Sequence, residues 1–129
     1  MHQESVNKQH SINKGINIRE ISAILNATMP CGNQHLDHET AYAFASDLMS
    51  DVLTLTTDSV LLITGLANVQ SIRTAEMSDI KCIIYARGKK ASPEMIELAE
   101  ENDMVLMECR YSMFKISGLL YRAGVQPVY

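Results

Sequence analysis

The segment from Val60 to Gly88 constrains the fold more than any other part of the chain. An apolar run of strand length, VLLIT, ends at Thr64-Gly65, a helical pattern follows, and a second apolar run, KCIIYA, closes the unit. A strand, a helix and a strand in this order are typical of a β-α-β crossover, in which the two strands lie parallel. The segment therefore predicts an α/β fold.

The same alternation extends over most of the chain. Apolar runs predict further strands at about Ala41–Ala45, in IKCIIYA and in VLMEC. Helical periodicity predicts helices at about Ile18–Asn26, in DLMSDVLTL, after Asn68, after Ser92-Pro93 and from Ser112 to Gly124. Strands that alternate with helices in this way indicate a three-layer α/β fold, in which a mainly parallel sheet carries helices on its faces.

Local signals mark where some of these elements begin and end. Asn17 and Glu20 have the spacing of a capping box for the first helix. Residues 28–33 contain a proline and a glycine, so we expect a loop there that ends this helix. Ser46-Asp47 can cap the next helix, whose apolar residues share a face: Leu48, Met49, Val52 and Leu53.

Length and composition predict one domain without a nucleic-acid or membrane partner. The chain has 129 residues, 47% of them apolar, which suits a single core over residues 16–129, preceded by a polar, flexible extension at residues 1–15. Its 15 acidic and 11 basic side chains give a net charge of −4, and nucleic-acid binding normally requires a basic face. No run is long enough to span a membrane, no signal peptide is recognisable, and the three cysteines are unclustered, so we expect a cytoplasmic protein with reduced thiols.

The candidate site lies where the parallel strands end. In open α/β sheets, ligands bind at the carboxyl ends of the strands, where helices begin and their first N–H groups are free. If the strands are neighbours, their junctions gather at one edge of the sheet, where Arg87 or Arg110 could bind an anion. We therefore predict a ligand-binding site that contains Ser46, Asp47, Thr64, Gly65, Asn68, Arg87, Gly88, Tyr111 and Ser112.

Most of these residues also have a plainer interpretation. Asn68, Ser46, Asp47 and Ser112 can serve only as helix caps, Gly65 can serve only to turn the chain, and the arginines can be solvated. The junction at Thr64-Gly65 lacks the glycine spacing of a dinucleotide site and the GK[ST] ending of a Walker loop. The sequence therefore indicates neither of these two familiar kinds of phosphate site.

Two further groups of reactive side chains are weaker candidates. Cys31, His35 and His38 include types that bind zinc or iron, but their spacing matches no familiar zinc motif, and a polar surface loop is the expectation. Cys109 precedes a helix start, where a thiol can be activated, yet a cysteine in an apolar strand is normally buried. We predict no metal site, no cofactor and no catalytic residue.

The junction sequences resemble those of a known family. The segments YAFASDLMSDVL, LLITGL, IRTAEM, RGKK and YSMFKISGLLYRAG together look like a stand-alone DRTGG-domain protein, and the resemblance covers nearly everything from Ile18 to Gly124. DRTGG domains are similar in fold to the N-terminal domain of HPr kinase/phosphorylase, and also occur in phosphate acetyltransferases and between CBS domains in regulated pyrophosphatases. The name-giving Asp-Arg-Thr-Gly-Gly string is absent, and its nearest counterpart is Arg73-Thr74.

The resemblance implies a regulatory or ligand-sensing module, frequently dimeric and without chemistry of its own. Similar stand-alone members are encoded beside iron-only hydrogenase genes in anaerobic bacteria, which implies a protein partner from such a system. No catalytic residue is transferred by this resemblance.

Three functions are compatible with these observations. The first, which we expect, is a non-catalytic regulatory module that binds a small anionic ligand, such as a nucleotide, and acts through a homodimer. The second is a pure protein-interaction module that docks through the last helix: Met113, Phe114, Leu119, Leu120 and Tyr121. The third is a small transferase or metal-dependent hydrolase that uses Ser46, Asp47, Arg87 and Cys109, and it requires an acid–base pair that the sequence does not display.

Overall fold

The computed structural model describes residues 15–129. The flexible extension predicted at residues 1–15 thus lies outside the described part of the chain, apart from Gly15. Two short strands, β1 (Ile16–Asn17) and β3 (Glu39–Thr40), pair antiparallel at the start of the domain. They are separate from the main sheet.

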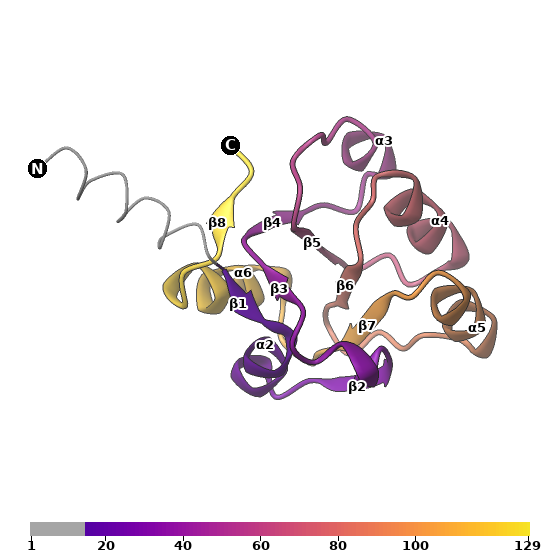
Figure 1. Ribbon diagram of the computed structural model, residues 1–129, viewed down its shortest axis with the longest axis horizontal. Coiled ribbons are helices and arrows are strands. Elements are labelled where there is room, and N and C mark those ends of the chain that lie inside the picture. Colours follow the sequence, from indigo (N-terminus) through magenta and orange to yellow (C-terminus); the bar gives the residue numbers. More distant parts are fainter. Residues whose placement is uncertain (1–14) are drawn as a thin grey trace, which may run out of the picture.

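The main sheet has six strands in the order β2-β7-β6-β5-β4-β8 (Figure 1). The strands are β2 (Thr28–Cys31), β4 (Tyr42–Ala45), β5 (Val60–Thr64), β6 (Cys82–Tyr85), β7 (Val105–Glu108) and β8 (Gln126–Pro127). The neighbouring strands β7, β6, β5, β4 and β8 are all parallel to one another, whereas the outermost strand β2 is antiparallel to β7. The predicted mainly parallel sheet is therefore confirmed.

Helices cover both faces of this sheet. They are α2 (Ile18–Leu25), α3 (Met49–Val52), α4 (Val69–Met77), α5 (Pro93–Glu101) and α6 (Met113–Arg122), with a short 3-10 helix at Asn33–His35. In Figure 1, α3, α4 and α5 lie on one side of the sheet and α2 and α6 lie on the other. The predicted three-layer α/β fold is therefore confirmed.

Coverage on both faces explains the composition of the central strands. All five residues of β5 are buried: Leu62 packs in the core beneath α3, α4 and α5, and its neighbours Leu61 and Ile63 pack in the core beneath α2 and α6. A strand that alternates between two apolar layers must be apolar at every position. For this reason VLLIT and CIIY form uninterrupted apolar runs.

The helix starts largely follow the predicted caps. Asn17 accepts a hydrogen bond from the Glu20 amide at 2.9 Å, and the Glu20 side chain receives one from the Asn17 amide, so the capping box is present. Ser92 accepts a hydrogen bond from the Met95 amide at the start of α5. Gly124, just after α6, has φ +109°, a left-handed conformation that glycine adopts without strain.

The loop predicted at residues 28–33 is wrong, because Thr28–Cys31 forms the edge strand β2. Proline is tolerated there since an edge strand leaves alternate N–H groups without a partner in the sheet. The register shifts between Thr28 and Cys31, which marks an irregularity in the pairing. The two-residue strands at the other edge and in the small sheet are too short to leave a periodic pattern.

The helix predicted over DLMSDVLTL is much shorter than expected. It spans Met49–Val52, and these two residues are buried, whereas Leu48 and Leu53 are 58% and 49% exposed. The predicted Ser46-Asp47 cap is wrong, since the N-cap position is Leu48 and no side chain caps it. The Asp47 side chain is used elsewhere, as described below.

No helix within residues 15–129 is long and apolar enough to cross a bilayer.

Candidate functional site

The carboxyl ends of β4 and β5 are joined by one aspartate. Asp47 Oδ1 accepts hydrogen bonds from the Gly65 amide at 2.6 Å and from the Thr64 hydroxyl at 2.8 Å. Thr64 Oγ1 in turn accepts a hydrogen bond from the Leu66 amide at 3.1 Å. The carboxylate of Asp47 thus occupies the donors that we expected an anionic ligand to use.

These contacts also fix the charge of Asp47. The hydrogen bond from the Gly65 amide, followed by that from the Thr64 hydroxyl, lowers the pKa of Asp47 below its ordinary value of 3.8. The positive charges of Arg87 and Lys89 act in the same direction, while partial burial opposes them. Asp47 is therefore ionised at neutral pH and acts as an internal anion between the two loops.

The loop after β6 brings Arg87 over this junction. A Cβ atom added to Gly65 would lie 3.0 Å from Arg87 Nη2 and 3.5 Å from Asp47 Oδ2, so both side chains border Gly65. The Arg87 and Gly88 amides donate to the carbonyl oxygens of Tyr111 and Cys109, each at 2.9 Å. The Arg87-Gly88 turn is therefore fixed to the loop after β7.

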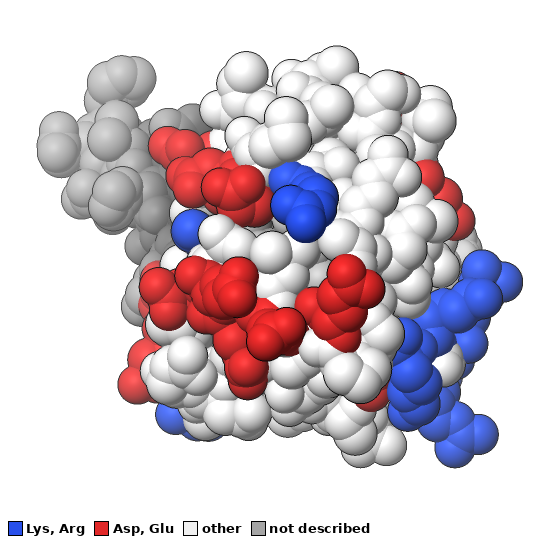
Figure 2. Space-filling model, turned by 90° about the vertical axis from the view of Figure 1, so that its right-hand side faces the viewer, with Lys and Arg blue, Asp and Glu red and all other residues white. Residues whose placement is uncertain are grey.

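This loop carries positive charge on an otherwise acidic protein. Arg87, Lys89 and Lys90 are all exposed, and Arg110 is exposed on the loop after β7. Figure 2, seen from the side of α4 and α5, shows Lys and Arg side chains gathered at one edge of this face, with Asp and Glu side chains over its middle. We call Arg87, Lys89, Lys90 and Arg110 the basic rim.

The rim also contains a carboxylate that stabilises it. Glu108, at the end of β7, accepts hydrogen bonds from the Ala91 amide at 2.8 Å and from the Thr28 hydroxyl at 3.2 Å. Lys90 Nζ lies 3.6 Å from Glu108 Oε1. Lys90 is thus partly neutralised by Glu108, as Arg87 and Lys89 are by the nearby carboxylate of Asp47.

The other predicted site residues make local contacts. Ser46 Oγ accepts from the Leu48 amide, Asn68 accepts from the Ser71 amide at the start of α4, and Ser112 accepts from the Lys115 amide at the start of α6. Tyr111 is half-buried, and Lys115 Nζ lies 3.9 Å from the centre of its ring. The structure thus brings Asp47, Thr64, Gly65 and Arg87 together, while Asn68 and Ser112 act as helix caps.

The structure gives no support to the two weaker candidate sites, because Cys31 and Cys109 are buried and the side chains of Cys31, His35 and His38 are not grouped together. Cys31 Sγ contacts the Met104 carbonyl oxygen and Cys109 Sγ contacts that of Leu25, both in buried positions. Burial raises the pKa of the Cys31 thiol. Within residues 15–129, no three side chains of types that bind metal ions lie close enough together to hold one, and this covers Cys31, His35 and His38.

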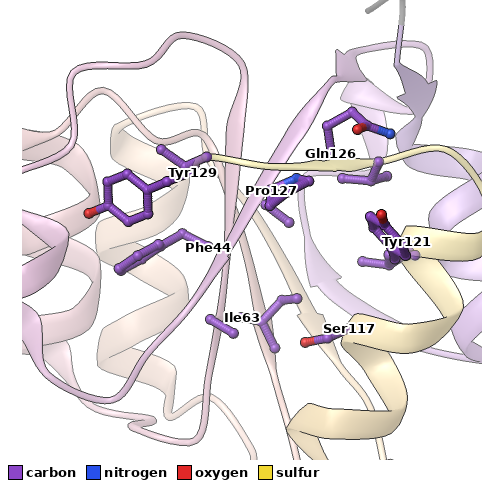
Figure 3. A pocket seen from close by; sticks show the side chains of 12 residues that line it. Phe44, Ile63, Ser117, Tyr121, Gln126, Pro127 and Tyr129 are labelled. Atoms are coloured by element: carbon purple, nitrogen blue, oxygen red, sulfur yellow. The ribbon is translucent and has the colours of Figure 1, made fainter. Parts of the chain in front are cut away.

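Sequence reasoning missed a pocket at the border of the sheet formed by β4 and β8. It has a volume of about 280 Å³ and lies between the end of β4, helix α6 and the C-terminal segment (Figure 3). Its lining residues are Ala43, Phe44, Ala45, Ile63, Ser117, Leu120, Tyr121, Val125, Gln126, Pro127, Val128 and Tyr129. The polar and aromatic residues of the sequence QPVY could have indicated a binding site. No pattern in the neighbouring sequence, however, predicts that they lie beside Phe44.

The fold and the junctions define a three-layer α/β domain whose loops converge at the carboxyl edge of a parallel sheet. The chain belongs to the DRTGG domain family, whose family model matches residues 20–123. The resemblance inferred from the sequence is therefore confirmed. No curated protein sequence matches the chain.

A solved structure supports the same fold. The chain is similar to the CBS and DRTGG domains of the regulatory region of Clostridium perfringens pyrophosphatase, crystallised with its activator, diadenosine tetraphosphate. The TM-score is 0.69 at 17% sequence identity, over 87% of this chain and 48% of that one. The chain thus spans about half the length of this relative.

The family's name-giving string has no counterpart at the rim. Arg73, the nearest match in the sequence, is exposed on α4, and Thr74 beside it is buried. Arg73 lines a hollow between α4 and α5 with Glu76 and Asn102. This hollow is separate from the junction at Gly65.

Proposed function

We propose that this chain is a non-catalytic regulatory module that binds a small anionic ligand, such as a nucleotide, at the basic rim, and acts through a homodimer. The observation that carries the proposal is the position of the Arg87 guanidinium beside Gly65, on a turn fixed by backbone hydrogen bonds to the loop after β7. A guanidinium presented from a fixed turn binds phosphate or carboxylate with less loss of conformational entropy than one carried by a mobile loop does.

The contacts of Asp47 refine which residues would bind the ligand. Because Asp47 already accepts from the Gly65 amide and the Thr64 hydroxyl, an anion would contact the side chains of Arg87 and Lys89 first. The remaining predicted residues, Ser46, Asn68, Gly88, Tyr111 and Ser112, would shape the loops around it. No side chain of this set is placed as an acid–base pair, which favours a binding role over catalysis.

The structural relative adds support of a different kind. It contains a DRTGG domain within the regulatory region of a pyrophosphatase, and that region was crystallised with a dinucleotide activator. A role in regulation and an anionic ligand are therefore reasonable for this domain too. The partner from an iron-only hydrogenase system that the family resemblance implies stays a prediction.

Arg87→Gln tests the ligand proposal. Thermal-shift screening with nucleotides, pyrophosphate and phosphorylated metabolites should raise the melting temperature of the wild type, since a ligand that binds the folded state stabilises it. Arg87→Gln should weaken binding of the best hit by about tenfold or more, because a charge-assisted hydrogen bond contributes about 1.5–3 kcal/mol. Arg122→Gln, which removes the same charge from the end of α6, is the matched control. No response to millimolar ligand across the panel would contradict the proposal.

The surface of α6 supports the homodimer. Phe114 is 90% exposed and Tyr121 is 65% exposed, and seven residues of helix place them on the same side. Between them, Gly118 has open space beyond its Cα. An antiparallel, two-fold pairing of α6 about Gly118 would bring each Phe114 against Tyr121 of the second copy.

Light scattering at micromolar concentration tests the dimer. We expect a dimer for the wild type and a monomer for Phe114→Glu, because the buried charge would be unpaired at the interface. Met77→Glu is the matched control, since Met77 is 71% exposed at the end of α4. A wild type that is monomeric would contradict the dimer, and a dimer that responds to no ligand would favour the pure interaction module.

A further inference from the structure

The pocket between β4, α6 and the C-terminal segment is a mostly apolar hollow to which the proposed function assigns no role. Its floor contains Ala45 and Ile63, which directly precede Ser46 and Thr64 at the carboxyl edge. The pocket therefore reaches the carboxyl edge, at which ligands bind in α/β sheets, at its Ala45 and Ile63 end. Its other end, at Gln126 and Pro127, lies beside the start of β4, where these residues pair with Tyr42 and Ala43.

Aromatic and cyclic side chains form its walls. The rings of Phe44 and Tyr129 meet edge to face, with centroids 6.3 Å apart and an interplanar angle of 82°. Figure 3 shows Tyr121 projecting from α6 and Pro127 crossing above the pocket. Phe44 lies on the same side of the sheet as Leu62, toward α3, α4 and α5, whereas Tyr121 belongs to α6, so these rings border the pocket from the two sides of β4. Flat apolar surfaces suit a flat ring, because ring faces and edges pack closely against aromatic side chains.

A few polar groups stand among the apolar ones. The Ser117 side chain extends from α6 toward the pocket in Figure 3. Gln126 Nε2 donates to the Gly124 carbonyl oxygen at 3.3 Å, which leaves the side-chain oxygen of Gln126 as an acceptor. A hydroxyl and an amide in an apolar pocket fix the orientation of a ligand that has its own polar ring atoms.

We propose that this pocket binds a flat heteroaromatic group of one or two fused rings, with the chemistry of a nucleobase. Its volume of about 280 Å³ is at the lower limit for small-molecule sites, so it would hold one ring system rather than a whole large ligand. The proposal deepens the proposed function, on which it rests for the anionic part of the ligand: the basic rim would bind the phosphates and this pocket would bind the base.

The proposal also gives a route from ligand to dimer. Tyr121 and Ser117 line the pocket, and both belong to the helix that we assign to self-association. A ring in the pocket would contact this helix directly. Ligand binding should therefore change the dimerisation equilibrium by the difference in ligand affinity between monomer and dimer.

The test measures binding of the ring and binding of the anion with two separate probes. Adenosine serves as the uncharged ring probe and pyrophosphate as the ringless anion. Binding is followed by tyrosine fluorescence, which is readable because the chain has five tyrosines and no tryptophan. Ser117→Phe should fill the pocket and weaken adenosine binding at least tenfold, while pyrophosphate binding stays unchanged. Gln70→Phe adds the same ring on exposed α4 and should change neither affinity.

Each outcome distinguishes the two proposals. Adenosine binding that Ser117→Phe abolishes and Gln70→Phe keeps, with pyrophosphate affinity the same in both variants as in the wild type, supports the pocket. Pyrophosphate binding without adenosine binding overturns the pocket and leaves the anion site standing. Adenosine binding that Ser117→Phe does not affect also overturns the pocket, provided that light scattering gives the variant and the wild type the same oligomeric state. If neither probe binds, the pocket proposal and the proposed ligand site both fail.

Discussion

Removal of the Asp47 carboxylate should destabilise the domain in a way that can be worked out from its contacts. In Asp47→Ala, the Thr64 hydroxyl and the Gly65 amide lose their acceptor, and both residues are buried. An unsatisfied buried polar group costs about 1–3 kcal/mol, and water can reach the space left by Asp47, which is exposed. We therefore expect a loss of about 2–3 kcal/mol in the free energy of unfolding.

Asp47→Asn is the matched variant, because its side-chain oxygen can still accept both hydrogen bonds. It should lose only the benefit of the charge, about 1 kcal/mol. For a domain of this size each kcal/mol lowers the melting temperature by about 4 °C, so we expect shifts of about 4 °C for Asp47→Asn and about 8–12 °C for Asp47→Ala. Thermal unfolding followed by circular dichroism measures both.

The pH dependence supplies an independent check. Because the folded protein lowers the pKa of Asp47, the stabilisation by the carboxylate is complete above the ordinary value of 3.8 and is lost as the pH falls through the lowered value. The difference between wild type and Asp47→Asn should therefore be constant from pH 7 to pH 5 and shrink below about pH 4. A difference that already shrinks near pH 6 would show that another group causes it.

The same variants test whether these donors can hold an external anion. Once Asp47→Ala has freed the Gly65 amide and the Thr64 hydroxyl, phosphate should raise its melting temperature more than that of the wild type or Asp47→Asn. Equal melting temperatures for Asp47→Ala and the wild type would refute the reasoning, because the two hydrogen bonds would then contribute nothing.

Other parts of the fold give further predictions. Gly32→Ala should destabilise the protein by about 2 kcal/mol or more in urea unfolding, because φ is +98° and the added Cβ would lie 2.7 Å from the Val105 backbone; a neutral result would contradict the geometry. Burial raises the pKa of Tyr85 to about 12, so the free energy of unfolding should fall as the pH rises from about 10 toward 12, and Tyr85→Phe should weaken this alkaline dependence. The three buried cysteines, among them Cys82 with its pKa raised to about 12, should react with a thiol reagent only after denaturation.

The central layers of the fold could be predicted because their pattern is local. The strand β5 and the helix α4 are close together in the sequence, and each has a local signal: an apolar run for the strand and the Asn68 cap for the helix. The apolar run is continuous because β5 is buried on both faces. The edge strands were different. β2 and β8 contain Pro30 and Pro127, and their pairing is fixed by neighbours that lie far away in the sequence.

The candidate site was predicted in outline for the same reason. Strand ends predicted that Thr64, Gly65 and Arg87 would meet, since parallel neighbours must end at one edge. The role of Asp47 could not be read from its neighbours in the sequence. Its partner, the Gly65 amide, is 18 residues away, and the local sequence suggested instead that Asp47 caps the helix that follows it. The pocket beside Phe44 was hidden because it depends on where the last residues of the chain return.

The prolines at the two outermost strands have a consequence for how copies of this domain can meet. Pro30 lies in β2 and Pro127 lies in β8, the two ends of the main sheet. Each lacks the N–H that a strand from another molecule would need, so continuous cross-molecule sheets are disfavoured at both borders. The two borders of the main sheet are therefore poor surfaces for edge-to-edge pairing of two copies.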